Sequence, residues 1–186
     1  SISVLSKYLI PDHFKLVALG KPTEKESKKW FKRYEKHLPK TGEIVFFDRS
    51  WYTRALVEAT MGYCTKRQYT YFMKNVIPWE QKQIDDGVEF FKFYLSIEKN
   101  TQQRRIDKRA TSPLVYWKIS ENDFKMLDKW DAFTLYKEQM FKRTSYENAP
   151  WIVLNANNKK VAILSALRYI LNAFDYPNKD LPKPKI

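Results

Sequence analysis

The sequence predicts an α/β fold in which one parallel sheet lies between two layers of helices. Short apolar runs, which suit strands, alternate along the chain with longer segments of helical periodicity. The run "VEFFKFYL" (residues 88–95) is apolar almost throughout, as expected for a strand that is covered on both faces. Strands that alternate with helices are joined by crossover connections, and such connections make neighbouring strands parallel.

We expect the elements in a regular order. At the start, "SISVLSKYLI" has the spacing of the later turns of an amphipathic helix, which indicates that further chain precedes it. Thr23 with Glu26 and Thr65 with Gln68 have the spacing of capping boxes, so each pair marks a helix start. Strands are predicted at residues 15–19, 43–47, 88–95 and 151–155, and helices at residues 23–36, 65–86, 102–110, 120–144 and 159–173.

The composition indicates one domain and a polyanionic partner. The 186 residues suit a single domain over residues 1–175, and residues 176–186 have the prolines and lysines of a solvated tail. The net charge of +13 and the isoelectric point near 9.6 favour an anionic polymer or nucleotide phosphates as the partner. Cys64 is the only cysteine, so no intramolecular disulfide is possible. With no membrane-length apolar stretch and no signal peptide, we expect a cytoplasmic protein without a membrane partner.

The stretch "EIVFFDRSWYTRA" (residues 43–55) places charged residues at the end of a strand. Asp48 follows four apolar residues, and ligands collect at the carboxyl ends of parallel strands. A carboxylate at that position can hold Mg²⁺ against a phosphate. Arg49, Arg54 and Glu58 add two cations and a second acid nearby in the sequence. The alternative interpretation is a helix start that is capped by an aspartate and stabilised by salt bridges.

A second stretch, "QQRRIDKRATSPLVYWKIS" (residues 102–120), is strongly basic. It sets five cations against one acid: Arg104, Arg105, Lys108, Arg109 and Lys118. Arginine side chains match phosphate oxygens with two donors at once. Pro113, followed by Tyr116 and Trp117, predicts a helix–loop–helix lid at about residues 100–125 that closes over transferring phosphates. A solvated charged surface is the alternative interpretation.

A third stretch, "LGKPT" (residues 19–23), also follows a strand. Lys21 can reach a phosphate there, and the helix that begins near Thr23 offers free backbone amides to an anion. His13 and His37 are too far apart in the sequence to indicate a metal site. The sequence has neither a Ser-His-Asp arrangement nor a Gly-x-Ser-x-Gly motif.

Taken together, these stretches resemble the polyphosphate kinase 2 family. "ALGKPTEKE", "HLPKTGEIVFFDRSWYTRALVE", "MGYC", the basic lid and "APWIVLNANNKKVA" follow the order of the family and cover about residues 10–172. The resemblance implies a fold similar to that of P-loop nucleotide kinases. It also implies reversible phosphoryl transfer, with Mg²⁺, between inorganic polyphosphate and a nucleotide (ADP/ATP, GDP/GTP or AMP), by a homo-oligomer that is a dimer or a tetramer.

The resemblance further implies roles for individual residues. Asp48 corresponds to the Walker B acid and would bind or orient Mg²⁺. Arg49 and Arg54 would contact phosphates, and Glu58 would support the metal site. The lid cations that would bind polyphosphate are Arg104, Arg105, Arg109 and Lys118, to which Lys21 at the strand end is added.

One departure from the family concerns the Walker A loop. The four glycines, Gly20, Gly42, Gly62 and Gly87, are at least 20 residues apart, so this chain holds no Gly-x-x-x-x-Gly-Lys loop. The alternatives are an upstream segment of the complete protein that supplies the loop, and a truncated or diverged member of the family. We expect the first, and we expect this chain by itself to be inactive.

Two other functions remain open at this level. A non-catalytic module that binds RNA or DNA needs no Walker A loop, but the aromatic residues do not interleave with the cations as stacking platforms do, so we expect no nucleic-acid partner. A nucleoside monophosphate kinase would share the sheet and the lid. The upstream sequence distinguishes these possibilities.

Overall fold

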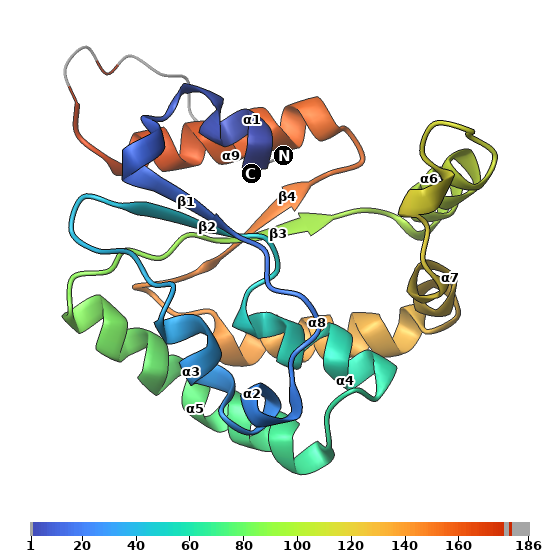
Figure 1. Cartoon of the computed structure of the whole chain (residues 1–186), viewed down its shortest axis with the longest axis horizontal. Helices are drawn as coiled ribbons and strands as arrows, with labels where there is room; N and C mark the ends of the chain where they lie inside the picture. The colour runs from blue at the N-terminus through green and yellow to red at the C-terminus, as the bar shows by residue number, and fades with distance from the viewer. Residues whose placement is uncertain (1, 177–178, 180–186) are drawn as a thin grey trace.

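In the computed structural model, which describes residues 2–176 and 179, the strands lie in the middle and the helices on both sides (Figure 1). The strands are β1 (Phe14–Val17), β2 (Ile44–Phe47), β3 (Lys92–Ser96) and β4 (Trp151–Asn155). On one side lie α1 (Ile2–Leu5) and α9 (Lys159–Ala173). On the other lie α2 (Glu24–Lys28), α3 (Trp30–Glu35), α4 (Val57–Met61), α5 (Lys66–Asp85) and α8 (Trp130–Thr144). The predicted α/β class is confirmed.

The strands pair in parallel, as predicted, but in two separate ladders. β1 pairs with β2 from Phe14↔Ile44 to Val17↔Phe47, and β3 pairs with β4 from Lys92↔Trp151 to Ser96↔Asn155. Within the described residues, no ladder joins β2 to β3, so the hydrogen bonds do not form one continuous sheet. Each described strand therefore keeps one edge without a strand partner in this part of the chain.

The remaining helical elements lie at the two ends of the strands. α6 (Lys99–Ala110), the 3₁₀ helix η4 (Tyr116–Lys118) and α7 (Glu121–Asp128) follow β3, and Figure 1 shows α6 apart from the other helical layers, on the side to which β3 points, with α7 below it beside α8. The 3₁₀ helix η3 (Trp51–Arg54) follows β2. Two further 3₁₀ helices, η1 (Ser6–Tyr8) and η2 (Pro11–His13), connect α1 to β1.

Two predicted helices are each broken into two. The helix expected at residues 23–36 is interrupted at Lys29, and the helix expected at residues 120–144 is interrupted at Lys129, both of which leave the helical conformation. In each case the break lets the second half pack on the core, as the buried residues of α3 and α8 show, while the first half follows another direction. The periodicity of a sequence does not show such a change of direction.

Other boundaries moved less. The capping boxes of Thr23 and Thr65 are both present, and Gly87, in the left-handed region at φ 91°, follows the long helix α5. The strand expected at residues 88–95 begins only at Lys92, where the ladder with Trp151 begins. The predicted tail, residues 176–186, lies outside the described residues except for Tyr176 and Lys179.

Two groups of buried side chains form the core. The larger joins α3, η3, α5 and α8, and its buried members are Trp30, Phe31, Tyr34, Trp51, Tyr52, Ala55, Leu56, Phe72, Met73, Val76 and Met140. The smaller lies between β4 and α9 and consists of Ile152, Leu154, Ala156, Ala162 and Ala166. Among the described residues, no helix is both long and apolar enough to cross a membrane.

Candidate functional site

The turn between β2 and η3 presents a carboxylate and a guanidinium to solvent. The backbone N–H of Asp48 donates to the Val17 carbonyl at 2.9 Å, and the residues Asp48 and Arg49 are exposed. Within the described residues, no hydrogen bond or ion pair joins either side chain to another residue. Arg49 has φ 68°, in the left-handed region that costs a residue with a Cβ atom free energy. The surrounding structure therefore holds this turn in a strained conformation.

Trp51, which follows the turn, is fixed at both its backbone and its ring. Its carbonyl accepts a hydrogen bond from Trp30 Nε1 at 2.9 Å, and its own Nε1 donates to Glu80 Oε1 at 2.8 Å. Tyr34 OH donates to the Ser50 carbonyl at 3.3 Å. The turn thus ends on a residue that α3 and α5 hold together.

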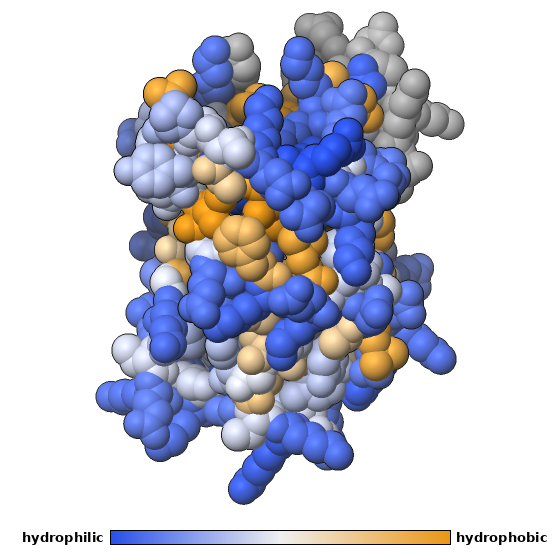
Figure 2. Space-filling view, turned by 90° about the vertical axis from the view of Figure 1, so that its right-hand side faces the viewer, coloured by the Kyte–Doolittle hydropathy of each residue, from blue (hydrophilic) through white to orange (hydrophobic). Residues whose placement is uncertain are grey.

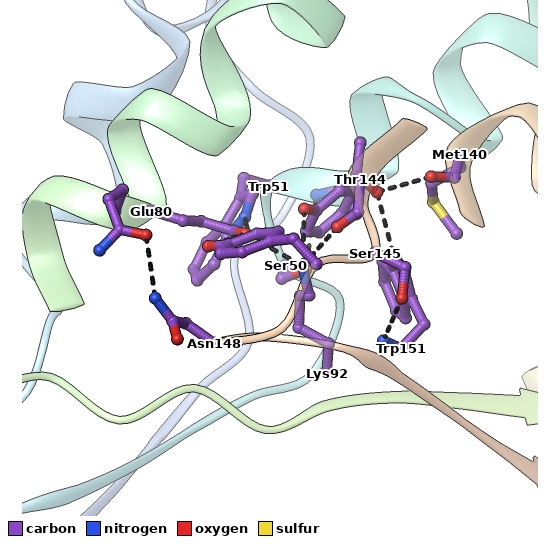
Figure 3. Close-up of polar contacts among 12 residues, drawn as sticks. Ser50, Trp51, Glu80, Lys92, Met140, Thr144, Ser145, Asn148 and Trp151 are labelled. Carbon is purple, nitrogen blue, oxygen red and sulfur yellow. Dashed lines mark hydrogen bonds and ion pairs between the residues drawn. The ribbon is translucent and has the colours of Figure 1, made fainter. Parts of the chain in front are cut away.

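Beneath Trp51 lies a buried ion pair between Glu80 of α5 and Lys92 of β3, which Figure 3 shows. Lys92 Nζ is 3.0 Å from Glu80 Oε2 and donates to the Thr144 carbonyl at 2.8 Å. Tyr146 OH donates to the same Glu80 oxygen at 3.1 Å. Burial lowers the pKa of Lys92, and the charge and hydrogen bond of Glu80 act in the opposite direction.

Arg54 and Glu58 form a second buried pair. Arg54 is 1% exposed, and its Nε lies 2.9 Å from Glu58 Oε2. The guanidinium also donates to the carbonyl and the hydroxyl of Ser27, at 3.2 and 3.1 Å, and lies over the Trp30 ring at 3.9 Å. Burial raises the pKa of the Glu58 carboxyl, and the charges of Arg54 and Arg33 partly oppose this rise.

These contacts bear on two predicted roles. Arg54 was expected to contact phosphates, but the structure surrounds its guanidinium with protein, so in this conformation it stabilises the start of α4. Glu58 is buried and pairs with Arg54, and its support of a metal site also stays a prediction. The phosphate contact of Arg54 stays a prediction.

Lys21 lies in the loop after β1, which Arg33 holds in place. Arg33 is buried, pairs with Glu26 at 2.9 Å and donates to the Gly20 carbonyl. Lys21, the next residue, is exposed. The loop is thus ordered from below, while Lys21 remains open to solvent.

The lid cations occupy unequal environments. Arg104 is exposed and donates to Thr101 Oγ1 at 3.1 Å. Arg105 is half-buried and donates to two carbonyls of the β4–α9 loop, those of Ala156 at 2.7 Å and Asn157 at 3.0 Å. Arg109 pairs with Asp123 of α7 at 3.4 Å, so it joins the two arms of the lid. Lys118 lies in η4, between these arms.

Figure 2 views the molecule from the side on which the lid stands, and it shows hydrophilic residues around an apolar patch. Apolar residues of the strands are among those left open, since Leu16 is 54% and Leu95 is 47% exposed. At the lid, Tyr116 and Trp117 are exposed, and their ring centroids are 5.9 Å apart. The predicted helix–loop–helix arrangement is present, whereas its closure over a substrate stays a prediction.

The residues suit magnesium only in combination with a substrate. No group of three or more His, Cys, Asp or Glu side chains in the described part of the chain is placed to hold a metal ion. Asp48 supplies a single exposed carboxylate. Mg²⁺ keeps several waters and binds through one or two carboxylates together with substrate phosphates, so Asp48 fits this ion.

Sequence reasoning missed Glu80, Lys92 and Arg33. One signal was available, because Lys92 is the one cation inside the apolar run of residues 88–95. A lysine in a strand that is covered on both faces needs a buried partner. The sequence offers no way to choose that partner among the acids of the chain.

The α/β fold, the exposed carboxylate turn and the basic lid define an α/β protein with a site suited to phosphate groups. The model of the family "Polyphosphate kinase 2 (PPK2)" matches residues 1–182 of the chain. The chain therefore belongs to the polyphosphate kinase 2 family.

Similar proteins are consistent with this membership. The chain is 45% identical over 181 residues to the GDP-polyphosphate phosphotransferase of Mycolicibacterium smegmatis. This match covers 97% of the chain and 64% of that protein. It is 44% identical to NDP-polyphosphate phosphotransferase 3 of Ruegeria pomeroyi, over 92% of this chain and 58% of that protein. The crystal structure of polyphosphate kinase 2 from Arthrobacter aurescens TC1 matches with a TM-score of 0.87 at 28% identity, over 97% of this chain and 66% of that chain. The chain thus spans about six-tenths of the curated relatives that it matches.

Proposed function

We propose that the complete protein transfers phosphoryl groups reversibly between inorganic polyphosphate and a nucleotide: ADP/ATP, GDP/GTP or AMP. The observation that carries this proposal is the turn after β2, where an exposed carboxylate and an exposed guanidinium stand side by side in a strained conformation. Family membership and the relatives named as GDP- and NDP-polyphosphate phosphotransferases support the same reaction.

In this proposal the exposed residues contact the substrates and the buried ones position them. Asp48 would hold Mg²⁺, which neutralises the negative charge on the transferring phosphates. Arg49 and Lys21 would contact phosphates from the strand ends, and Arg104, Arg105, Arg109 and Lys118 would bind the polyphosphate chain from the lid. Arg54 and Glu58 would keep the turn and the start of α4 in place.

We also propose that the complete fold is a three-layer parallel sheet similar to that of P-loop nucleotide kinases. The two separate ladders support this, because an additional parallel strand would pair with β2 and β3 and make the sheet continuous. The exposed residues Leu16, Ile44 and Leu95 would gain apolar cover in such a sheet. The strand and its phosphate-binding loop would come from sequence beyond these 186 residues.

The test is turnover by the full-length protein with long and short polyphosphate, together with affinity for a random single-stranded oligonucleotide. We expect turnover that falls strongly in the Arg105→Ala and Arg109→Ala variants, more so with longer polyphosphate, and little change in oligonucleotide affinity at physiological salt. Oligonucleotide binding without turnover would favour the nucleic-acid module. Transfer from ATP but not from polyphosphate would favour a nucleoside monophosphate kinase.

Two further properties belong to the same proposal. Nucleotide substrates and a single cysteine support a cytoplasmic location. Likeness to the family supports a homo-oligomer, either a dimer or a tetramer, and light scattering on the full-length protein measures which of these forms in solution.

A further inference from the structure

The buried Glu80–Lys92 ion pair forms hydrogen bonds to several separate elements of the molecule. Glu80 and Lys92 are buried in α5 and β3, and their hydrogen bonds reach Trp51 and Tyr52 of η3, the Thr144 carbonyl at the end of α8, and Tyr146 beyond it. Lys92 Nζ also lies over the rings of Tyr146, at 4.7 Å, and Tyr52, at 5.3 Å. The pair is therefore the point at which the helical layer, η3 and the β3–β4 ladder meet (Figure 3).

Stability alone is a poor reason for such a pair. Removing two charges from water costs free energy, and well-packed apolar residues of similar volume are often as stabilising as a buried ion pair or more so. A buried polar network does, however, select one arrangement of the groups around it, because every alternative arrangement leaves a donor or an acceptor unpaired. The pair is thus better explained by the arrangement that it selects.

The group whose orientation Glu80 fixes is the Trp51 indole. The ring packs against those of Trp79 at 4.9 Å and Phe90 at 5.6 Å, so its apolar face is enclosed by other rings. The Nε1 donor reaches the Glu80 carboxylate at 2.8 Å, and a rotation of the ring away from it would break this hydrogen bond and leave a buried donor unpaired. Trp51 lies three residues after Asp48, and the intervening Arg49 is held in the left-handed region. Fixing Trp51 therefore fixes the end of a turn that would otherwise relax.

We propose that Glu80 is a positioning residue which, through Trp51, holds the Asp48–Ser50 turn in its working geometry, and that Lys92 balances the charge of the buried Glu80 carboxylate. The inference rests on the proposed function, in which Asp48 holds the metal against the phosphates. Neither Glu80 nor Lys92 touches the substrate, since both are buried beneath η3.

The test compares two neutral double variants of the full-length protein. Glu80→Gln/Lys92→Met, the acceptor variant, keeps an oxygen for the Trp51 N–H. Glu80→Leu/Lys92→Met, the acceptor-free variant, removes that oxygen, and both variants lose the charges equally. With both proteins fully folded at the assay temperature, we expect kcat of the acceptor-free variant to fall about 10- to 100-fold with KM within about 3-fold of wild type. The acceptor variant should retain kcat within about 3-fold.

Hydrogen exchange supplies a readout that does not depend on activity. In the acceptor-free variant, amides of residues 48–54 should exchange at least about 10-fold faster than in the acceptor variant, while amides of α9 stay unchanged. A merely stabilising pair would raise exchange in α9 as well. If the wild type showed no polyphosphate turnover, the proposed function would be wrong, and exchange alone would decide the positioning role.

Equal kcat values or equal local exchange in the two double variants would overturn the proposal. If either double variant failed to fold, Trp51→Phe provides the same test, because it removes the indole N–H and leaves the ion pair intact. We then expect the same loss of kcat and the same local rise in exchange. Unchanged kcat and exchange in Trp51→Phe would overturn the proposal equally.

Discussion

The region beneath the Asp48 turn and the lid differ in how deeply their charged residues are buried. Beneath the turn, Arg33, Arg54 and Lys92 are buried, and each pairs with a glutamate inside the protein. On the lid, Arg104 is exposed, and Tyr116 and Trp117 face solvent. Cations of both regions contact protein groups, but those beneath the turn are buried in ion pairs with glutamates, whereas the lid keeps Arg104 exposed.

This difference separates positioning from contact. A buried charge that loses its partner destabilises the protein strongly, whereas an exposed charge contributes little to stability. Substitutions beneath the turn should therefore change mainly the stability and the local geometry of the protein. Substitutions at exposed positions should change mainly substrate binding and rate.

Asp48→Asn should lower the phosphoryl-transfer rate of the full-length protein by about 100- to 1000-fold, because the carboxylate acts on charge that develops during transfer. The melting temperature should change by less than about 2 °C, since Asp48 is exposed and pairs with no described side chain. The measurement is steady-state turnover at saturating Mg²⁺ with thermal unfolding in parallel. Asp86→Asn, at an exposed position after α5, is the control and should be active. Retained activity in Asp48→Asn would show that this carboxylate does not hold the metal.

Arg54→Ala should destabilise the protein by about 3 kcal/mol, because it leaves the buried Glu58 carboxylate without its partner. Arg67→Ala, at an exposed arginine of α5, should cost less than about 0.5 kcal/mol. Denaturant unfolding of the two variants measures the difference. A small loss of stability in Arg54→Ala would mean that this arginine is available to bind substrate. The contrast between the two regions would then be wrong.

The cost of Arg54→Ala should also depend on pH. Burial raises the pKa of Glu58, and Arg54 opposes the rise, so removing Arg54 raises that pKa further. A carboxyl with a raised folded-state pKa stabilises the fold below the unfolded pKa of about 4.3 and loses this contribution as pH rises through the folded pKa. The destabilisation should therefore be larger at pH 7 than at pH 5. In Arg54→Ala/Glu58→Gln the difference between the two pH values should disappear.

Substitution of the two adjacent lid arginines, Arg104 and Arg105, should have different effects on stability. Arg105→Ala removes hydrogen bonds to the Ala156 and Asn157 carbonyls and should cost about 1–2 kcal/mol of stability as well as rate. Arg104→Ala should leave stability within about 0.5 kcal/mol and lower the rate about 10-fold with long polyphosphate. Unfolding and turnover of both variants test this pair. Equal losses of stability in the two variants would show that Arg105, which is bonded to the β4–α9 loop, and the exposed Arg104 do not differ in their structural role.

The smallest effect concerns the bond that ties α7 to the end of α4. Tyr63 OH donates to Asn122 Oδ1 at 2.7 Å in an exposed position, so Tyr63→Phe should cost less than about 1 kcal/mol. Amides of α7 should exchange about 2- to 5-fold faster, as measured by hydrogen exchange. Tyr71→Phe removes the hydroxyl of another exposed tyrosine and should leave this exchange unchanged.

The sequence by itself determined the α/β class, the order of the strands and helices, both capping boxes and the family. These features depend on local periodicity, on short-range spacing and on motif order, all of which a single chain displays. The long helix that ends near Gly87 was predicted for this reason, and so was the position of Asp48 after an apolar strand.

Only the tertiary structure decided which charges face solvent and which are buried. Arg49 and Arg54 lie five residues apart and carry the same charge, yet one is exposed and the other is 1% exposed. The same holds for the partners Glu80 and Lys92, which packing brings from α5 and β3 to 3.0 Å. The breaks at Lys29 and Lys129 follow the same rule, since each redirects a helix onto the core. Burial and pairing depend on contacts between segments that are distant in the sequence, and the spacing of residues along the sequence does not predict those contacts.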